Sequence, residues 1–555
     1  MLKTKPKNQQ NQPKAQPKTH LQPNGAVALE AAPPTLRQRL AQRRKTNRLR
    51  QELITFTIFA VLFSTVIGFV VGLVAGIRPG IGTTIGTLCT ALSFKYPRQA
   101  LWAFLLYMPF SGSITYALGS SPLLQLAKDG FYVPAVFGVI QYCRREKLPV
   151  LVPRQMIAPV GVLLGLSLMT LLVVNGAQQL NPTPGEQPIL LGILGLKVLM
   201  GYIPLVVCAY YLLRDRRDLL FLMRFTVVLI LVCCALAFVQ YLLLKTGRCP
   251  GTRFAQGPDL YRASLSARCF VGGALLYTPQ FNQIRLPGTF VAPWQWGWFL
   301  ISSAFLAFAT AFSDPRTRWR TTGLISLASV FIMAVLSGQR VALILVPIIF
   351  IILLVLTGQV VNLKRFIPGA VILGFVLGFA ALRNPEILAQ RFESLQSRWE
   401  ASPPHLFILE QFQWSINNQN FLGNGLGRAT NAARTLGDTE LIETYYPKLL
   451  YEIGILGTLA FLVLVTVLTA LTFWAYRPLR DRTLRGYGAA LWLFVLFISY
   501  NTYYYPLDVD PVAVYYWFFA GVVLKLPELE RQERLDAAAT QPQNSRRRFK
   551  RSGFA

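Results

Sequence analysis

The chain passes from a long polar loop into an apolar run through Leu422-Gly-Asn-Gly-Leu-Gly-Arg428 and then Tyr446-Pro-Lys-Leu-Leu-Tyr-Glu-Ile-Gly-Ile-Leu-Gly457. The surrounding interval, Arg383–Gly457, is the longest part of this hydrophobic chain without a complete membrane-spanning run. Charged residues lie on both sides of the first glycine stretch: Arg391, Arg398, Glu440 and Glu443. Cations, carboxylates and aromatic residues therefore gather at the mouth of a membrane helix, which indicates a binding site rather than a plain connection.

Apolar residues make up 53% of the 555 residues, and they occur in runs of about 17–25 residues, the length that crosses a bilayer. Only helices and closed barrels satisfy their own backbone in lipid, and continuous runs favour helices over barrel strands. The sequence predicts an all-α, polytopic integral membrane protein with about fourteen transmembrane helices. The predicted spans are 54–77, 80–94, 99–118, 123–142, 155–174, 188–213, 219–244, 289–312, 321–338, 341–357, 366–382, 447–473, 487–505 and 511–526.

The distribution of Lys and Arg predicts the orientation, because cytoplasmic loops are enriched in both. Twelve Lys or Arg precede the first span, and the other predicted inner connections are short and basic. These connections are 95–98, 144–147, 214–217, 316–320, 364–365 and 477–485. The predicted outer connection 175–187 has no basic residue, and 506–511 carries only Asp508 and Asp510 as charged residues. The pattern predicts cytoplasmic termini and places the long loops 245–288 and 383–446 outside.

Three regions follow from these spans: a basic tail at 1–53, a membrane domain at 54–526 and a second basic tail at 527–555. The first tail is rich in Lys, Gln, Pro and Asn and is predicted to be disordered. The net charge of +31 is explained in part by these tails, which would lie near anionic lipid of the inner leaflet. Nucleic-acid binding is the alternative, but the tails lack interleaved aromatic residues and any recognisable module, so no nucleic-acid partner is expected.

The seven cysteines have no metal-ligand spacing, so neither a metal nor a cofactor is expected. Cys249 and Cys269 lie in one external loop, and an oxidising periplasm would allow them to pair; whether they are bridged stays open. Three ionisable residues lie within apolar runs, where such groups are costly and tend to face a cavity. Lys128 either pairs with Asp129 or reaches the interface, whereas Lys197 is more isolated and is either structural or directed into the site.

Two arginines stand at the outer ends of predicted spans. Arg285 opens Arg-Leu-Pro-Gly-Thr-Phe290, and Arg340 ends the tight turn Ser337-Gly-Gln-Arg340. A guanidinium stays charged and donates in a planar, bidentate pattern that matches phosphate oxygens. Two of them at one cavity mouth would hold a diphosphate and stabilise it as a leaving group. The alternative is that both are interfacial anchors beside an aromatic belt.

The order of these motifs resembles that of the O-antigen ligase and polymerase superfamily, the Wzy and WaaL type proteins. The resemblance covers residues 280–475 and is carried by Arg285–Phe290, Ser337–Arg340, Leu422–Gly427 and Leu449–Gly457. It implies a metal-independent glycosyltransferase with a GT-C-like helical fold in the bacterial inner membrane, working on its outer face. It further implies an undecaprenyl-diphosphate-linked glycan as donor, with Arg285 and Arg340 on the diphosphate, and partners such as a flippase and a chain-length regulator. The sequence also resembles a cyanobacterial branch tied to hormogonium polysaccharide.

One departure from the family bears on the choice of base. Ligases of this family carry a His-Asn pair about nine residues before the Glu that precedes Gly-Ile-Leu-Gly, and that pair falls at Glu443-Thr444 here. The two histidines of the chain are His20, in the tail, and His405, early in the large loop. The departure favours a polymerase over a ligase to a lipid A core, and it makes Glu443 the candidate general base.

The neighbours of Glu443 supply further candidates. Glu440 would share a helix face with it if the helix begins that early, and either could then be the base. Tyr445 and Tyr446 are candidates for stacking on sugar rings. Arg391, Arg398, Arg428 and Lys197 complete the expected substrate-binding set. The competing interpretation of Glu443 is that it only favours a helix N-terminus.

The leading hypothesis is a membrane polymerase that joins lipid-linked oligosaccharide repeats for an exopolysaccharide or O-antigen-type polysaccharide. A ligase to another acceptor is the alternative within enzymes, and a lipid-linked oligosaccharide flippase is the alternative from another class. Flippases usually have short loops on both faces, whereas the ionisable residues of this chain gather on one face. A non-catalytic scaffold would leave that one-sided cluster unexplained.

Overall fold

A computed structural model describes residues 36–117, 127–150, 153–257, 267–273, 277–278, 283–360, 374, 378, 382–383 and 385–540. It divides into two compact units, Met1–Val66 and Ile67–Ala555. The described part of the first unit belongs to helix α1 (Leu36–Ala75), whose early arginines Arg44, Arg48 and Arg50 are exposed. The second unit contains every site residue described below.

The described residues of the second unit up to residue 245 form α2 (Ile77–Lys95), α3 (Pro97–Tyr107), η1 (Met108–Phe110), α4 (Ser111–Ala117), α6 (Ala127–Arg145), η2 (Arg154–Met156), α7 (Ile157–Met169), η3 (Thr170–Asn175), α8 (Gly176–Leu180), α9 (Pro188–Met200), α10 (Leu205–Leu212) and α11 (Arg216–Lys245). They are followed by the strands β1 (Tyr277–Thr278) and β2 (Gln283–Ile284) and the helices α12 (Pro293–Ser313) and α13 (Thr317–Leu336). The rest of the unit contains α14 (Arg340–Leu356), α16 (Pro385–Ala401), α17 (Pro404–Asn417), η7 (Asn431–Ala433), α18 (Tyr445–Tyr476), α19 (Arg482–Tyr500), η8 (Pro506–Asp508) and α20 (Val512–Thr540). The two short strands pair antiparallel, with Tyr277 opposite Ile284.

Eight helices in the described residues are long and apolar enough to cross a membrane: Arg50–Ala75, Arg154–Leu180, Arg216–Lys245, Pro293–Ser313, Thr317–Leu336, Tyr445–Tyr476, Arg482–Tyr500 and Val512–Ala538. The pair α9 and α10, bent by 41°, would make a ninth, and α14 is a shorter apolar helix. These results confirm a helical chain suited to several membrane crossings.

The full count of about fourteen spans stays a prediction. The predicted spans at 80–94 and 123–142 coincide with α2 and α6, and the span at 99–118 is divided among α3, η1 and α4. None of these helices is among the eight. Helix α6 carries Lys128, Asp129 and two terminal arginines, and charged residues lower the apolar character on which the assignment depends. Nearly all of the predicted span 366–382 lies outside the described residues.

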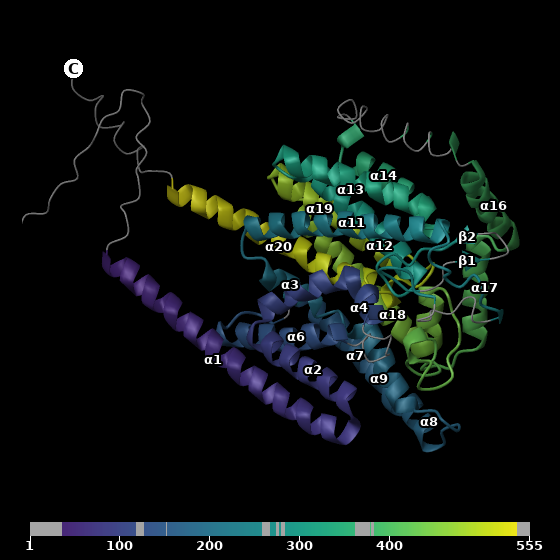
Figure 1. Cartoon of the computed structure of the whole chain (residues 1–555), viewed down its shortest axis with the longest axis horizontal. Coiled ribbons are helices and arrows are strands. Elements are labelled where there is room, and N and C mark those ends of the chain that lie inside the picture. The colour runs from purple at the N-terminus through teal and green to yellow at the C-terminus, as the bar shows by residue number, and fades with distance from the viewer. Residues whose placement is uncertain are drawn as a thin grey trace, which may run out of the picture. The chain divides into compact units, whose positions relative to one another are not determined.

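Helix α12 forms the core of the second unit. Of its most apolar window, 94% is buried inside the protein, and it packs against α11, α13, α14 and α19. Figure 1 shows these five helices running beside one another. Ser302, Ser303 and several alanines line α12, and such small residues let membrane helices approach closely. A Cβ at Gly323 of α13 would lie 2.6 Å from the backbone nitrogen of Ala311, which shows how close the two helices are.

Ion pairs hold three of the predicted inner connections, 95–98, 214–217 and 477–485, close to one another. Arg98 binds Asp218 at 2.7 Å, and Arg216 binds both Asp481 and Glu533. Each of these ion pairs joins segments that are far apart in the sequence. The grouping fits the alternating topology, because connections on one side of a membrane must meet one another.

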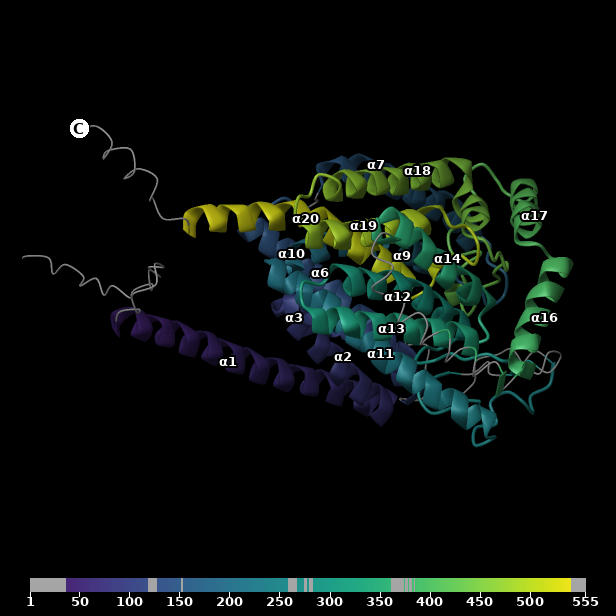
Figure 2. The same ribbon diagram turned by 90° about the horizontal axis from the view of Figure 1, so that it is seen from above.

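Helices α16 and α17 both belong to the predicted outer loop 383–446. In both views, α16 and α17 lie at the end of the unit opposite to the C-terminal end of α20 (Figures 1 and 2). The strands β1 and β2 lie beside α16 and α17 in Figure 1. Figure 2 also shows α18 lying along α7, a pair that is in contact. Helices α16 and α17, which belong to the predicted outer loop 383–446, therefore lie away from the C-terminal end of α20, whose Glu533 pairs with Arg216.

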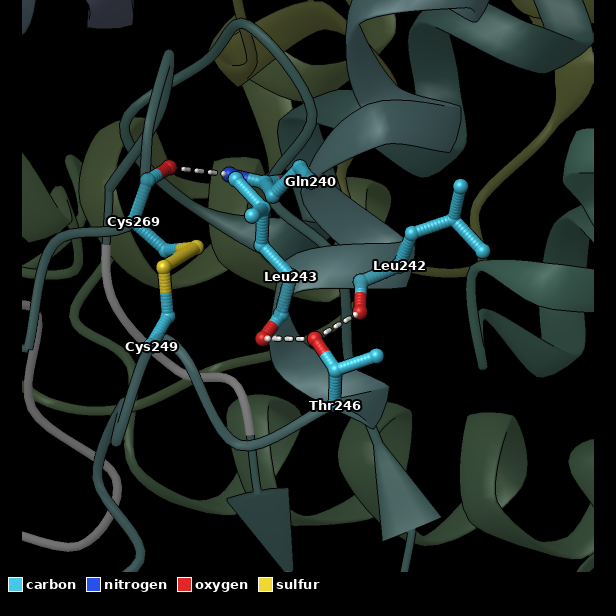
Figure 3. The surroundings of a disulfide bond; sticks show 6 residues. All are labelled: Gln240, Leu242, Leu243, Thr246, Cys249 and Cys269. Atoms are coloured by element: carbon cyan, nitrogen blue, oxygen red, sulfur yellow. Dashed lines mark hydrogen bonds between the residues drawn. A yellow bond between two sulfur atoms is a disulfide. The ribbon is translucent and has the colours of Figure 1, made fainter.

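Cys249 and Cys269 form a disulfide, with their Cα atoms 5.6 Å apart. Figure 3 shows this bond beside the end of α11, where the side-chain amide of Gln240 donates to the Cys269 carbonyl at 2.9 Å. Thr246 ends the helix by donating its hydroxyl to the Leu242 carbonyl at 2.8 Å. The question left open by the sequence is thus answered, and the loop after α11 is tied to the helix that precedes it.

Candidate functional site

The two arginine motifs meet at one backbone contact. The backbone N–H of Leu286 donates to the Ser337 carbonyl at 3.0 Å, so Arg285 and the turn before Arg340 are neighbours. Helix α13 ends at Leu336 and α14 begins at Arg340, and Gly338 has a φ of +70° in the turn between them. A positive φ is accessible to glycine at little cost, which explains the tight turn. The structure therefore places the segments that carry Arg285 and Arg340 next to each other.

The first turns of α12 connect this arginine turn to the loop between α19 and α20. A Cβ at Gly297 would lie 3.4 Å from the side chain of Gln339. The next residue, Trp298, donates its indole N–H to the Tyr504 carbonyl at 3.2 Å. Tyr504 and Tyr505 both have positive φ, +56° and +34°, a conformation that is strained for bulky residues. Such strain persists only where the surroundings impose it, and it often marks functional segments.

Glu443 lies beside this strained loop. The backbone N–H of Tyr445 donates to the Thr502 carbonyl at 2.7 Å, and Thr444 forms a bridge with Tyr503. Burial raises the pKa of Tyr505, and the nearby charges of Glu443 and Asp508 raise it further. Asn431 donates its amide to the Tyr505 hydroxyl at 3.2 Å. The Glu443 side chain is partly exposed, and its charge acts on the phenol of Tyr505.

Helix α18 begins at Tyr445, with Thr444 as its N-cap residue. Glu440 lies before the helix, where its backbone N–H donates to the Arg428 carbonyl at 2.7 Å and its side chain is exposed. The expectation that Glu440 and Glu443 share a helix face depended on an earlier start, and it is wrong. The backbone N–H of Glu443 is itself bound, to the side-chain oxygen of Gln411 at 3.2 Å.

The glycine stretch docks on a break in α18. Gly454 has a φ of +67°, which interrupts the helical hydrogen bonds. The carbonyls of Tyr451 and Glu452 are taken instead by the backbone N–H groups of Asn424, at 2.8 Å, and Gly425, at 3.2 Å. Backbone polar groups at membrane depth must find such partners within the protein. The glycines are needed because a Cβ at Gly423 would lie 2.4 Å from the Glu452 backbone.

The helix formed by α7, η3 and α8 holds the same stretch from the other side. Asn175 accepts from the Leu426 N–H at 2.9 Å and donates to the Leu426 carbonyl at 3.1 Å. Thr170 and Gln178 donate to the carbonyls of Leu422 and Asn424. The stretch is therefore a tight turn whose backbone is engaged within the protein.

Arg428 ends this stretch and is held by its neighbours. Its guanidinium forms a bidentate pair with Glu186, at 2.8 and 3.1 Å, and it also binds Gln178 and the Asp438 carbonyl. The hydrogen bonds from Arg428 lower the pKa of Glu186 to about 2. Arg428 was expected among the substrate-binding residues. In this structure its donors serve an ion pair between two predicted outer loops.

This ion pair leads to a prediction about stability. Because the pKa of Glu186 is lowered from 4.5 to about 2, its contribution is present above pH 4.5 and is lost as the pH falls toward 2. Glu186→Gln removes the charge, and breaking such a pair costs about 3 kcal/mol at neutral pH. We expect Glu186→Gln to unfold at a lower temperature than the wild type at pH 7, measured in detergent. As the pH falls from 4.5 toward 2, we expect the unfolding temperature to decrease less for Glu186→Gln than for the wild type. Glu393→Gln, at an exposed position of α16, is the matched control. Equal unfolding temperatures for the two variants at pH 7 would contradict the role of the pair.

Lys197 and its neighbours pair differently from the expectation. Lys197 binds Asp129 at 2.9 Å, and Lys128 binds Asp510 of the loop between α19 and α20. Both ammonium groups lie near the ring of Tyr202, 5.8 and 5.7 Å from its centroid. The expected alternatives for Lys128 were Asp129 or the interface, and Lys197 was thought more isolated; the structure corrects both. Lys197 pairs with Asp129 because α9, which carries Lys197, places it next to Asp129 of α6.

Three other expected site residues, Tyr445, Arg391 and Arg398, and the loop histidine His405 are placed as follows. Tyr445 is 3% exposed and packs against Phe461, so a stacking role on sugar rings does not fit this placement. Arg391 and Arg398 belong to α16, and their side chains lie outside the described part. His405 is exposed on α17 beside Trp399, as expected for a surface residue.

The sequence did not single out two buried charges on α18. Lys448 is 2% exposed and binds Asp508, while Glu452 is 3% exposed. Glu452 accepts hydrogen bonds from the Ala429 N–H at 2.8 Å and the Thr430 hydroxyl at 3.0 Å. Their spacing of one helical turn inside an apolar run was a usable signal, because ionisable groups in a span are rarely neutral to structure or function.

The described helices define the class of this chain: a helical membrane protein with several candidate spans. No model of a known protein family matches the chain, and no characterised protein or solved structure matches it either. Among the described residues, no group of three or more His, Cys, Asp or Glu could hold a metal ion.

Proposed function

We propose that this protein is a membrane glycan polymerase that joins undecaprenyl-diphosphate-linked oligosaccharide repeats on the external face of a bacterial inner membrane. In each step an acceptor hydroxyl attacks the anomeric carbon of a lipid-linked repeat. The bond between that carbon and the diphosphate oxygen breaks, undecaprenyl diphosphate leaves, and a carboxylate takes the hydroxyl proton. The enzyme would use neither metal nor cofactor.

One observation carries the proposal. Contacts run without a gap from the arginine turn, through the start of α12, to the loop beside Glu443. Arg285 and Arg340 would stabilise the leaving diphosphate, and Glu443 would be the base. A single mouth that offers both cations and a carboxylate suits a glycosyl transfer from a diphosphate donor.

The roles divide further in this arrangement. Arg391 and Arg398 would steer the anionic lipid to the site, because solvated charges act over a distance. Lys197 and Arg428 would maintain the walls of the site through their ion pairs with Asp129 and Glu186. The disulfide between Cys249 and Cys269 favours an oxidising compartment on this face, which supports the external orientation.

The glycan profile of a deletion strain tests the proposal. Loss of a polymerase leaves single repeats on lipid carriers outside the cell, whereas loss of a flippase leaves none there. Loss of a ligase to another acceptor leaves long chains that are not transferred. A profile without single repeats would contradict the proposal that the protein is a polymerase. A flippase remains the candidate from another class of protein. The described charged residues proposed to bind the diphosphate lie on one predicted face of the membrane, which favours the enzyme.

The orientation gives a separate prediction. Cysteines introduced at Ala401 and Arg434, both exposed, are expected to react with an impermeant thiol reagent in intact cells with a permeabilised outer membrane. Cysteines at Asp215 and Arg482, exposed at the other end, are expected to react only after the inner membrane is opened. The positive-inside pattern is the physical reason. The reverse labelling would place the arginines on the wrong side for this donor.

A further inference from the structure

Two buried hydrogen-bond donors near the arginine turn have no partner in the part of the chain that the structure describes. They are the indole nitrogen of Trp296 and the side-chain nitrogen of Gln339. Trp296 is 0% exposed. Buried donors are nearly always paired in native proteins, so an unpaired one calls for an explanation. A ligand that offers acceptor oxygens would supply it.

Trp296 lies directly beneath the turn that carries Arg285. A Cβ at Gly288 would lie 2.4 Å from the six-membered ring of the indole, and Gly288 has a φ of +57°. Position 288 thus requires glycine for two reasons: its backbone conformation, and the lack of space for a side chain above the ring. The ring is fixed from below by Phe299, with centroids 5.3 Å apart. The indole is therefore held rigidly against the Arg285 motif.

Gln339 lies on the neighbouring side of the same turn. It directly precedes Arg340 and is the N-cap residue of α14, a helix of 17 residues. Its side chain contacts α12 at Gly297, the residue after Trp296. The residues that carry the two unpaired donors thus lie on neighbouring segments, and the Leu286–Ser337 backbone bond joins the segments that carry Arg285 and Arg340. The N-terminus of α14 adds partial positive charge at this point.

The chemistry of these side chains defines the ligand. An indole N–H donates and cannot accept, and the same is true of a guanidinium. Gln339 carries an acceptor oxygen as well, but the atoms of the two side chains that lack a partner are both N–H donors. The oxygens of an ionised diphosphate accept only, so they match two unpaired donors better than a sugar hydroxyl, which also donates. We propose that Trp296 and Gln339 donate to oxygens of the diphosphate held by Arg285 and Arg340, an inference that rests on the proposed function.

Binding of farnesyl diphosphate, a short isoprenyl diphosphate, to the full-length protein in nanodiscs tests this assignment. Trp296→Phe keeps the aromatic packing and removes the N–H. Because a hydrogen bond to a charged acceptor is among the stronger ones, we expect binding to weaken about tenfold or more in calorimetry. Trp294→Phe is the matched control, since Trp294 lies on the same helix and is 43% exposed. Gln339→Leu is a second variant, and its binding is also expected to weaken.

A spectroscopic signal distinguishes hydrogen bonding from packing. In protein labelled with 15N at the indole nitrogens, farnesyl diphosphate is expected to shift one resonance downfield, and that resonance is absent from Trp296→Phe. Unfolding temperatures of both variants identify any that fail to fold. If Trp296→Phe and Gln339→Leu fold and bind as Trp294→Phe does, the inference is overturned.

The two proposals fail in different ways. If the wild type binds farnesyl diphosphate and Arg340→Ala does not, while Trp296→Phe binds normally, only the inference is wrong. If the wild type does not bind farnesyl diphosphate, the donor class of the proposed function is wrong as well. Inorganic pyrophosphate is the remaining arm. Equal affinity for it would assign the site to free diphosphate, and weaker binding would assign it to the lipid form.

Discussion

Arg340→Ala is expected to abolish polymer while the protein stays in the membrane at normal abundance. Arg340 begins α14 next to the turn whose Ser337 carbonyl binds the Leu286 N–H. A guanidinium at this point would stabilise charge as the diphosphate leaves, and loss of one such group costs about 10²–10³-fold in rate. Arg285→Ala is expected to have the same effect for the same reason. The measurement is the length distribution of surface glycan, with an immunoblot for abundance.

Arg340→Lys is expected to recover little of the polymer. One ammonium is a point charge and cannot reproduce the planar fork of a guanidinium. Arg434→Ala is the matched control, because Arg434 is an exposed arginine of another predicted outer segment, the loop 383–446. If Arg340→Ala makes polymer of normal length, the residue is an interfacial anchor and the diphosphate is held elsewhere.

Hydrophobic runs were sufficient to locate most of the helices. The predicted spans at 219–244, 289–312 and 447–473 correspond to α11, α12 and α18, because apolar length and helical structure are linked in a membrane. The sequence also predicted that Arg285 and Arg340 lie close together, and their segments are neighbours in the structure. That prediction needed only the topology, because two short motifs at the outer ends of their spans lie on the same side of the membrane.

Contacts between distant segments could not be predicted in the same way. The local pattern of Leu422–Arg428 does not predict that this stretch binds at a break in α18. The glycine at which the helix breaks, Gly454, could be read from the sequence, but its partner could not. The partners of Lys128 and Lys197 were wrong because the nearest carboxylate in the sequence is not the nearest in space. Asp510 lies 382 positions from Lys128. Charge pairing across a bundle depends on which helices are neighbours, and hydropathy does not determine that.

The role of Glu443 was the other uncertain point, and the helix start changes how it is tested. With α18 beginning at Tyr445 and Thr444 as its N-cap residue, Glu443 lies just outside the helix, beside Tyr505. Glu443 is partly exposed here, and the N-cap position of the helix belongs to Thr444 instead. The two interpretations, a general base and a charge that favours the helix N-terminus, therefore predict different outcomes on substitution.

Glu443→Gln is expected to leave single-repeat glycan with normal protein abundance. The substitution keeps the size of the side chain and removes the group that would accept the acceptor hydroxyl proton, a contribution of about 10²–10⁴-fold in rate. If Glu443 only favours the helix N-terminus, the loss is about 0.3–1 kcal/mol of stability, and polymer would be close to normal. Glu440→Gln is the matched control, because Glu440 is exposed and lies outside the helix. Normal polymer from Glu443→Gln together with single repeats from Glu440→Gln would identify Glu440 as the base instead.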